Sequence, residues 1–308
     1  MMADFVAVDW GTSSFRLWVM ARDGRLHGES RGPEGMSHCV TAGFAPVLAA
    51  HLARAEAPAD LPILICGMAG ARQGWFEAPY ADLPAPITAL AAKAVRLPGH
   101  LLADLPNPRD IRILPGLAQR DAAHPDVMRG EETQLFGLAN QAIEGLVCLP
   151  GTHCKWANLQ DGAVTGFASY ITGELFDLLS RQSILRHAMP ETYAIAPDDP
   201  DFLAAADQAM ADPGLLTEAL FPLRAGQLLD YRGREATQAR LSGLLIGAEV
   251  GRQVAGNALK SVTLVGQQGL GALYAAVLTR AGLSMKTVDA ENASRQGLLA
   301  AAREIWRF

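Results

Sequence analysis

The chain has 308 residues, half of them apolar, and a formal net charge of −6. This length suggests two domains, or one large one, with enough apolar residues for a sizeable core in each half. An acidic chain is not expected to bind nucleic acid, although a few local arginines can still attract an anionic substrate. No apolar run approaches the length of a membrane-spanning helix, so we expect no membrane partner.

The cysteines indicate a reducing compartment. None of the four belongs to a Cys-x-x-Cys pair, and they stand at Cys39, Cys66, Cys148 and Cys154. Free thiols are typical of the cytoplasm, and the N-terminus has no basic segment of a secretory signal. Cys148, His153 and Cys154 could suggest zinc, but the sequence offers no fourth ligand beside them.

The first stretch with chemical character runs from Phe5 to Trp18. Its apolar start predicts a buried strand, and Asp9 follows at the strand's end, where a carboxylate can hold hydrated Mg²⁺. Gly11 allows a tight turn, and the N–H groups of Thr12 and Ser13 can form a phosphate-binding concavity. The apolar residues from position 15 predict the returning strand of a hairpin.

A second stretch, residues 146–156, has the same order of parts. An apolar strand leads into Gly151-Thr152-His153, and a basic and an aromatic residue, Lys155 and Trp156, follow. Each copy then reaches an Asp-Gly pair, at residues 23–24 and 161–162, which is a strong hairpin signal. The copies lie about half a chain apart, as expected for two similar domains.

Between the copies, residues 44–57 predict a helix and residues 61–66 a short strand that leads into the glycine-rich segment 67–70. The carboxyl end of a strand that leads into glycines is where α/β sheets bind ligands. Beyond it, Trp75 could pack against a sugar and Arg72 could pair with a carboxylate. An ordinary surface loop explains these two residues equally well.

Residues 84–114 are punctuated by prolines and predict loops around a helix at 87–94 and a strand at 112–114. Arg129 and Gly130 then precede a helix whose first residues are Glu131 and Glu132. Acids in a first turn complement the helix dipole, which explains them structurally without any function. Neighbouring residues on a helix point about 100° apart, so at most one of the two can face a given site squarely.

The second half predicts a strand at 163–170, a helix at 172–185 and a largely helical insertion at 187–240 with proline breaks. Residues 241–256 predict a helix whose glycines at 243, 247 and 251 share one face, which favours close packing. A strand at 261–265, a helix at 272–281 and a strand at 286–288 follow.

The loop from Gly266 to Gly271 resembles a dinucleotide fingerprint and raises an NAD-dependent oxidoreductase as a rival class. Its glycines stand at Gly266, Gly269 and Gly271, a G-x-x-G-x-G order instead of G-x-G-x-x-G. Too few residues also remain after Asp289 to complete a sheet of sequential βα units. No Gly-x-x-x-x-Gly-Lys-Ser/Thr occurs, which excludes a P-loop kinase.

The paired hairpins resemble the sugar kinase, actin and heat-shock ATPase superfamily, and several segments are similar to the signatures of the 2-dehydro-3-deoxygalactonokinase family. They occur in that family's order and cover most of the chain: Asp9-Trp10-Gly11-Thr12-Ser13, Gly67-Met68-Ala69-Gly70, Met128-Arg129-Gly130-Glu131-Glu132-Thr133-Gln134, Pro150-Gly151-Thr152-His153-Cys154-Lys155-Trp156, Thr172-Gly173-Glu174-Leu175 and Ser242-Gly243-Leu244-Leu245-Ile246-Gly247-Ala248-Glu249.

The resemblance implies an α/β fold of two actin-like (ribonuclease H-like) ATPase domains facing a central cleft. Residues 1–137 would bind the sugar acid and carry the first phosphate hairpin. Residues 138–308 would bind the nucleotide, with the last helix packing back on the first domain. The implied reaction is ATP-dependent phosphorylation of 2-dehydro-3-deoxy-D-galactonate at its 6-hydroxyl, a step of galactonate catabolism, with ATP and Mg²⁺ as cofactors and the sugar acid as small-molecule partner.

The resemblance also implies roles for individual residues. Glu132, in preference to Glu131, would accept the hydroxyl proton, and Asp9 would hold Mg²⁺ through water. ATP would be bound by Gly11, Thr12, Ser13, Gly151, Thr152, His153, Lys155, Gly266 and Gly269. The sugar acid would meet Trp75, and its carboxylate would pair with at least one of Arg16, Arg72 and Arg129.

Other classes stay open on sequence alone. A glutamate in place of the aspartate of many relatives is shared with exopolyphosphatases, so a polyphosphate or nucleotide phosphohydrolase is an alternative. A third class is a non-catalytic, nucleotide-switched binding protein, against which the paired glutamates argue. The sequence specifies neither the substrate's stereochemistry nor the oligomeric state.

Overall fold

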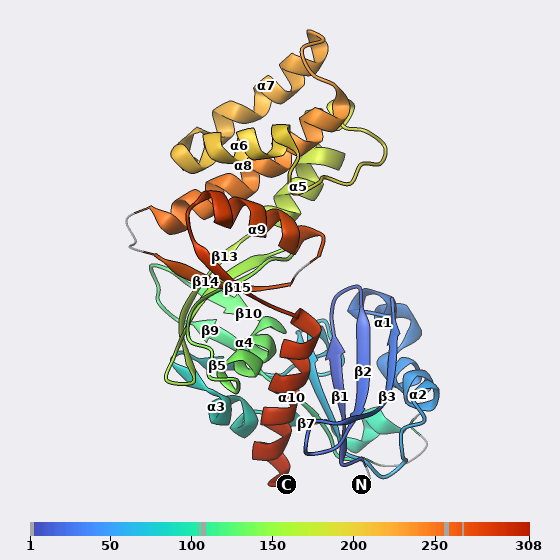
Figure 1. Ribbon diagram of the computed structural model, residues 1–308. Helices are drawn as coiled ribbons and strands as arrows, with labels where there is room; N and C mark the ends of the chain where they lie inside the picture. Colours follow the sequence, from blue (N-terminus) through green and yellow to red (C-terminus); the bar gives the residue numbers. More distant parts are fainter. Residues whose placement is uncertain (1–2, 104, 106–108, 256–258, 267) are drawn as a thin grey trace. The chain divides into compact units, whose positions relative to one another are not determined.

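The computed structural model describes residues 3–103, 105, 109–255, 259–266 and 268–308 (Figure 1). The chain forms two compact units. The first consists of Met1–Gly145, Ala157–Phe167 and Ala290–Phe308, and the second of Leu146–Trp156 and Ala168–Asp289. The first segment of the first unit thus extends to Gly145, whereas we predicted a domain boundary after residue 137.

A six-stranded sheet forms the centre of the first unit. In spatial order its strands are β3 (Leu26–Gly32), β2 (Phe15–Met20), β1 (Phe5–Trp10), β4 (Ile63–Gly67), β8 (Ile111–Ile113) and β7 (Val95–Arg96). The strands β1 and β2 form the predicted antiparallel hairpin, with Asp9 opposite Arg16. The strand β4 runs parallel to β1, with Cys66 beside Asp9.

Both faces of this sheet are covered, and the residues of β1 alternate between them as the two-residue period of a strand requires. Val6, Val8 and Trp10 pack into the cluster that includes Leu48 and Leu52 of α2 (Phe44–Arg54). Phe5 and Ala7 pack on the other side, against Leu298, Leu299, Ala301 and Ala302 of α10 (Ala290–Trp306). Burial on both faces explains why β1 is continuously apolar up to Asp9.

The remaining helices of the first unit are α1 (Met36–Ala42), α3 (Ile87–Ala92), α4 (Glu131–Ala139) and the 3₁₀ turns Met68–Gly70 and Gly99–Leu102. In Figure 1, α10 lies beside α4. Glycines make this contact possible: a Cβ on Gly137 would meet the carbonyl of Ala293, and one on Gly297 would meet that of Thr133. The end of the chain is thereby held against the helix that begins with Glu131.

The region 80–128 contains more strand than we expected. We predicted one strand, at 112–114, and the structure has it at Ile111–Ile113. A three-stranded sheet of β10 (Asp126–Met128), β9 (Gly116–Gln119) and β5 (Tyr80–Asp82) also forms there. These strands are short, and β5 pairs with β9 from a distant part of the chain, so a local apolar period does not reveal them.

The second six-stranded sheet contains the second hairpin. Its order is β15 (Ser284–Val288), β14 (Ser261–Val265), β11 (Gly145–Leu149), β12 (Cys154–Gln160), β13 (Ala163–Tyr170) and β6 (Ala85–Pro86). The strand β14 runs parallel to β11 and to β15. In each six-stranded sheet the first strand of the hairpin thus lies between its returning strand and a parallel strand, which is the repeat that the sequence indicated.

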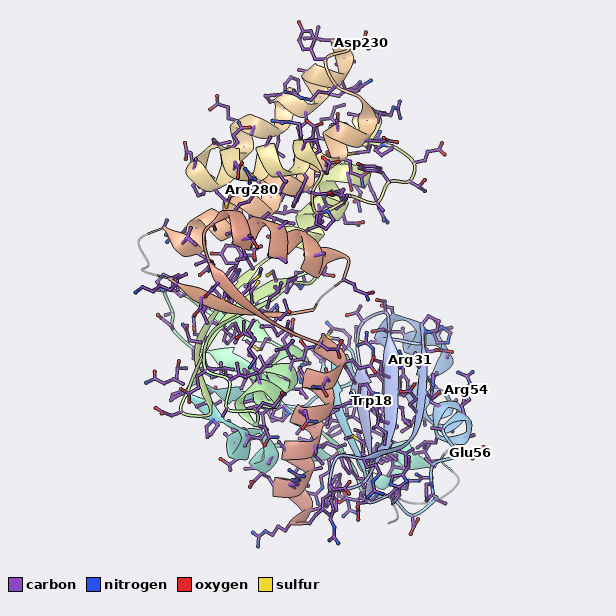
Figure 2. All side chains as sticks on the ribbon, in the orientation of Figure 1. Trp18, Arg31, Arg54, Glu56, Asp230 and Arg280 are labelled. Atoms are coloured by element: carbon purple, nitrogen blue, oxygen red, sulfur yellow. The ribbon has the colours of Figure 1, made fainter. Side chains whose placement is uncertain are left out.

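Helices of the second unit are α5 (Thr172–Arg181), α6 (Pro200–Ala211), α7 (Leu216–Leu228), α8 (Arg234–Val254) and α9 (Leu270–Arg280), with 3₁₀ turns at Ile184–Ala188 and Pro213–Leu215. Three features of these helices differ from expectation. The helix α5 ends at Arg181 instead of 185, α8 begins before 241, and Pro222 lies inside α7 instead of breaking it. Arg280 of α9, labelled in Figure 2, pairs with Asp207 of α6, with Nε and Oδ1 2.6 Å apart.

Among the described residues, no single helix is long and apolar enough to cross a membrane. One pair, α1 with α2, passes the same length and composition test together, with a bend of 110° between the two helices. In the structure, Cys39, Leu48 and Leu52 of this pair are buried in the core of the first unit.

The predicted glycine face of α8 packs against α6. A Cβ on Gly243, Gly247 or Gly251 would meet the backbone of Phe202, Ala206 or Met210, respectively. The glycines of α8 and the residues of α6 that they contact are both spaced four residues apart, so each helix uses a single face along the whole contact. The stripe therefore serves packing, as we expected.

We predict that Gly247→Ala destabilises the protein by about 1–3 kcal/mol, because the new methyl group must push α6 away. In an exposed helix the same change would stabilise by about 1 kcal/mol. Gly99→Ala is the control, since a Cβ at Gly99 would meet none of the described atoms within 4 Å. Denaturant unfolding of both variants compares them, and an unchanged midpoint for Gly247→Ala would contradict the packing.

Candidate active site

Asp9 lies at the end of β1 in the first unit, and its side chain is 15% exposed. Its Oδ2 accepts hydrogen bonds from Arg16 Nη1 at 3.4 Å and from Ser294 Oγ of α10 at 3.2 Å. Burial raises the pKa of the Asp9 carboxyl, and the Arg16 charge opposes this rise. A carboxylate at a strand end, with a second oxygen to offer, has the chemistry that Mg²⁺ prefers.

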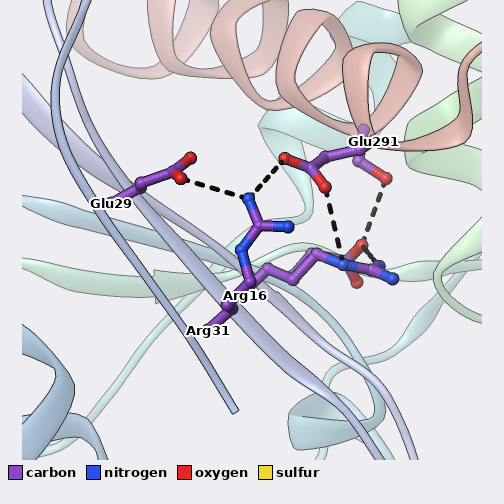
Figure 3. A network of polar contacts seen from close by, with 6 residues as sticks. Arg16, Glu29, Arg31 and Glu291 are labelled. Carbon is purple, nitrogen blue, oxygen red and sulfur yellow. Dashed lines mark hydrogen bonds and ion pairs between the residues drawn. The ribbon is translucent and has the colours of Figure 1, made fainter.

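Charged side chains of β2, β3 and α10, among them Arg16, Arg31 and Glu291, form a network (Figure 3). Arg16 Nε lies 4.0 Å from Glu291, and Arg31 Nη2 lies 3.3 Å from Glu291 and 3.2 Å from Glu29. Glu291 stands near the start of α10, where an acid also complements the helix dipole. This network fixes Arg16 beside Asp9, a pairing that sequence spacing alone did not reveal.

Glu132 is fully buried at the start of α4. Its Oε2 accepts from the Gly130 N–H at 2.6 Å and its Oε1 from the Thr133 hydroxyl at 3.0 Å. Burial, with the nearby charge of Glu131, raises the pKa of Glu132 to about 8 despite these donors. A carboxyl with a pKa close to neutrality can both take up and release a proton, as a general base must.

Glu131 points differently from its neighbour. It is half-buried, and its Oε2 accepts from the Arg129 N–H at 3.2 Å. Its charge raises the pKa values of both Asp9 and Glu132, so it lies within electrostatic reach of each. The structure thus groups Asp9, Glu131 and Glu132 in one unit.

The segment Gly67–Gly70 lies against the start of α4. A Cβ on Gly130 would lie 3.6 Å from Gly67 Cα, and one on Gly70 would lie 2.9 Å from Arg129 Nη1. Arg129 stacks on the Tyr80 ring at 4.5 Å and donates to the Ala78 carbonyl at 2.8 Å. Its buried Nε and Nη1 have no hydrogen-bond partner among the described residues, which is unusual for a guanidinium.

Arg72 and Trp75 follow Gly70 in the chain and have partners of their own. The Arg72 side chain is 82% exposed and lies 3.7 Å from Glu77. Trp75 is half-buried, stacks on Phe44 at 5.9 Å and meets Trp10 edge-on at 6.0 Å. Aromatic packing therefore accounts for much of the Trp75 ring.

Each of the two Gly-Thr turns is exposed at its tip. In the first, the carbonyls of Gly11 and Thr12 accept from the first amides of α1, which anchors the turn while Thr12 and Ser13 stay exposed. The second turn rests on the start of α5: a Cβ on Gly173 would meet the Gly151 carbonyl at 2.5 Å, and Glu174 N–H donates to the Thr152 carbonyl.

The polar residues of the second turn do not all face the same way. His153 Nε2 lies 2.7 Å from Glu174 Oε2 on the exposed side. Lys155 is buried, and its Nζ donates back to the His153 carbonyl at 3.0 Å. Lys155 therefore supports the turn from within in this arrangement.

A cavity of about 750 Å³ lies in the second unit beside this turn. Gly151, Thr152 and Gly269 line it, whereas His153, Lys155 and Gly266 do not. Gln267 of the same loop lies outside the described residues. Gly269 has φ 56°, a conformation that favours glycine and lets α9 begin directly after the loop.

Much of this cavity comes from residues that the sequence did not single out, among them Phe176, Tyr193, Ile195, Gln238 and Leu270. An apolar cavity with a few polar groups suits a flat aromatic base, and the neighbouring turn suits phosphates. Tyr193 and Ile195 belong to the irregular part of the insertion, so only the folded chain brings them to the cavity.

One buried group in the described part of the chain could in principle hold a metal: Cys148, Cys154 and Glu249. The thiols lie 3.8 Å apart, and burial raises the pKa of each. Glu249 on α8 is a third candidate ligand that the sequence did not place beside them. Its two oxygens already accept hydrogen bonds from Trp156, Thr172 and Tyr274.

Comparison with known proteins identifies a family. A family model described as 2-keto-3-deoxy-galactonokinase matches residues 9–301. A Rhizobium meliloti (strain 1021) protein named "Probable 2-dehydro-3-deoxygalactonokinase" is 50% identical over 305 residues, 98% of this chain and 97% of that one. The 2-dehydro-3-deoxygalactonokinase of Escherichia coli (strain K12) is 33% identical over 314 residues, 99% of each chain.

Solved structures confirm the fold class. A crystal structure from Sinorhizobium meliloti, assigned to the 2-dehydro-3-deoxygalactonokinases, has a TM-score of 0.92 at 50% identity and covers 99% of this chain and 100% of that one. Component A of Acidaminococcus fermentans (R)-2-hydroxyglutaryl-CoA dehydratase is 13% identical, with a TM-score of 0.52 and 98% of each chain covered, and shares the fold alone. The chain has the predicted α/β fold of the actin-like ATPases.

The raised pKa of Glu132 predicts a pH-dependent stability. The folded chain keeps a proton that the unfolded chain releases above its ordinary pKa of 4.5, so stability is lost as the pH rises from there to about 8. Glu132→Gln should therefore gain stability over the wild type at pH 8 and much less at pH 4.

Urea unfolding at both pH values measures the difference. The exposed Glu191, which lies in no helix, provides the comparison, because the Glu191→Gln variant shows how much the loss of one exposed acid changes stability at each pH. An equal effect of Glu132→Gln at both pH values would show that the carboxyl titrates normally.

Proposed function

Because the chain belongs to the 2-dehydro-3-deoxygalactonokinase family, we propose that it transfers the γ-phosphoryl group of ATP to the 6-hydroxyl of 2-dehydro-3-deoxy-D-galactonate. It is a sugar-acid kinase, and neither an oxidoreductase nor a phosphohydrolase is favoured by the family match. The observation that carries the proposed chemistry is the buried Glu132 carboxyl at the start of α4, which accepts hydrogen bonds from the Gly130 N–H and the Thr133 hydroxyl.

Each unit supplies a distinct part of this proposed reaction. In the first, Glu132 accepts the hydroxyl proton, while Glu131 and the Arg129 side chain orient the sugar acid. In the second, the cavity beside Gly151 and Thr152 holds adenosine, and the turn formed by these two residues contacts the phosphates. Phosphoryl transfer depends mainly on positioning and charge stabilisation, which such residues provide.

A coupled ADP-release assay with a panel of 2-keto-3-deoxy sugar acids tests the function. We expect turnover with 2-dehydro-3-deoxy-D-galactonate and ATP, and no NAD⁺ reduction. ADP release that is independent of every sugar acid would favour the phosphohydrolase instead.

The buried free cysteines Cys39, Cys66, Cys148 and Cys154 support a cytoplasmic location.

Mg²⁺ fits Asp9 as a ligand through water, with Ser294 orienting the carboxylate. When bound, the ion would neutralise phosphate charge. Asp9→Asn keeps the side-chain size, so we predict a folded protein that loses nearly all turnover at any Mg²⁺ concentration. Circular dichroism checks the fold, and near-normal turnover at saturating Mg²⁺ would remove Asp9 from the metal site.

General-base catalysis typically contributes about 10²–10⁴-fold, so Glu132→Gln should lower kcat by that factor with little change in KM for ATP. Glu131→Gln should lower kcat less, since Glu131 is half-buried and Glu132 alone occupies the fully buried position at the start of α4. Both variants are measured at saturating ATP and sugar acid. A larger loss in the Glu131 variant would exchange the two roles.

Arg129 is the arginine that best suits the substrate carboxylate, because an anion would satisfy the two nitrogens that have no hydrogen-bond partner in the described part of the chain. We predict that Arg129→Ala raises KM for the sugar acid more than Arg16→Ala does, and that it leaves KM for ATP nearly unchanged. Arg72→Ala serves as an exposed control. If all three variants keep the wild-type KM for the sugar acid, no carboxylate partner lies among them.

A further inference from the structure

Glu249 is a buried acid that the proposed chemistry does not use. It lies on α8 and is 2% exposed. Its Oε1 accepts from Trp156 Nε1 at 2.7 Å, and its Oε2 accepts from the Tyr274 hydroxyl at 2.7 Å and from the Thr172 hydroxyl. A carboxylate has only acceptor sites, and these three donors use both of its oxygens.

The three donors belong to three separate segments of the second unit. Trp156 lies on β12, which follows the turn at Gly151 and Thr152. Thr172 is the first residue of α5, and Tyr274 lies on α9, which begins directly after Gly269. The turn, α5 and α9 each contribute lining residues to the cavity, whereas Glu249 itself is not among them.

The donors are well defined chemically. Indole N–H can only donate, and burial raises the pKa of Tyr274 well above its ordinary value, so its hydroxyl keeps the proton it donates. A buried acceptor with several donors is costly to disturb, because each donor left without a partner stays desolvated. One side chain of α8 thus holds the phosphate turn, the start of α5 and the start of α9 at fixed spacing.

We propose that Glu249 is the positioning residue of the nucleotide cavity: by binding Trp156, Thr172 and Tyr274 together, it sets the spacing between the Gly-Thr turn and the helices that enclose the nucleotide. This inference rests on the proposed function in one respect, that the occupant of the cavity is ATP.

The Glu249→Gln variant provides a selective test. The glutamine side chain has the same volume as glutamate and keeps one acceptor oxygen. Its N–H₂ group takes the place of the other oxygen, so two donors face each other, for example N–H₂ and Trp156 Nε1–H. We expect Glu249→Gln to weaken ATP binding about 10- to 100-fold, with kcat at saturating ATP changed only a few-fold. The double variant Glu249→Gln/Trp156→Phe removes the opposed donor and should recover part of the affinity.

Two further variants keep the test decisive. Tyr274→Phe removes a single donor without changing the packing volume, so it should fold even if Glu249→Gln does not, and it should weaken ATP binding by a smaller factor. Thr237→Val is the matched control, since Thr237 is also buried on α8 but its hydroxyl donates to the carbonyl of Gly233, directly before the same helix. It should lower the melting temperature while leaving ATP affinity unchanged.

ATP affinity is measured by calorimetry without sugar acid, which separates this inference from the proposed reaction. If the wild type binds ATP but phosphorylates no sugar acid, the proposed kinase reaction is contradicted, whereas the proposed positioning role of Glu249 is not. The role of Glu249 is overturned if Tyr274→Phe and Glu249→Gln bind ATP as tightly as the wild type, or if Thr237→Val weakens binding equally. Stoichiometric zinc in the purified protein would also overturn it, because Glu249 would then be a metal ligand.

Discussion

The close contact between α4 and α10 is the constraint on which the first unit depends. Gly137 and Gly297 let the two backbones meet without side chains between them. The last helix is thereby held so that Ser294 bonds Asp9 and Glu291 reaches Arg16 and Arg31. Residues from the beginning, the middle and the end of the chain thus form one polar site around β1.

The same site illustrates how burial serves chemistry at the expense of stability. Desolvation raises the pKa values of Asp9 and Glu132, and the charge of Glu131 adds to both. The donors from Gly130, Thr133, Arg16 and Ser294 limit this effect without cancelling it. Titratable groups with such perturbed pKa values cluster at functional sites, since a proton acceptor works best with a pKa near the working pH.

The two hairpins share a strand order but are stabilised differently. The first carries exposed charges that pair across β2, β3 and α10, centred on Arg16 and Arg31. The second is supported from within by the buried Glu249 and Lys155. A turn held by buried hydrogen bonds is pre-organised for its ligand, because little conformational freedom is left to lose on binding.

The two hairpins, the α/β class and the positions of Asp9, Glu131 and Glu132 can be predicted from the amino-acid sequence. These features depend on local signals: an apolar strand that ends in an acid or a Gly-Thr pair, and acids in the first turn of a helix. The glycine face of α8 could also be predicted, because a spacing of four residues places these glycines on one side of the helix whichever element packs against it.

The folded chain alone establishes which residues far apart in the sequence interact. It paired Arg16 with Asp9 and Ser294, packed Trp75 against Phe44, and left two nitrogens of Arg129 without partners among the described residues. It also joined Trp156, Thr172 and Tyr274 at Glu249. Such contacts depend on burial and on donors far apart in the chain, and neither local periodicity nor motif spacing carries that information.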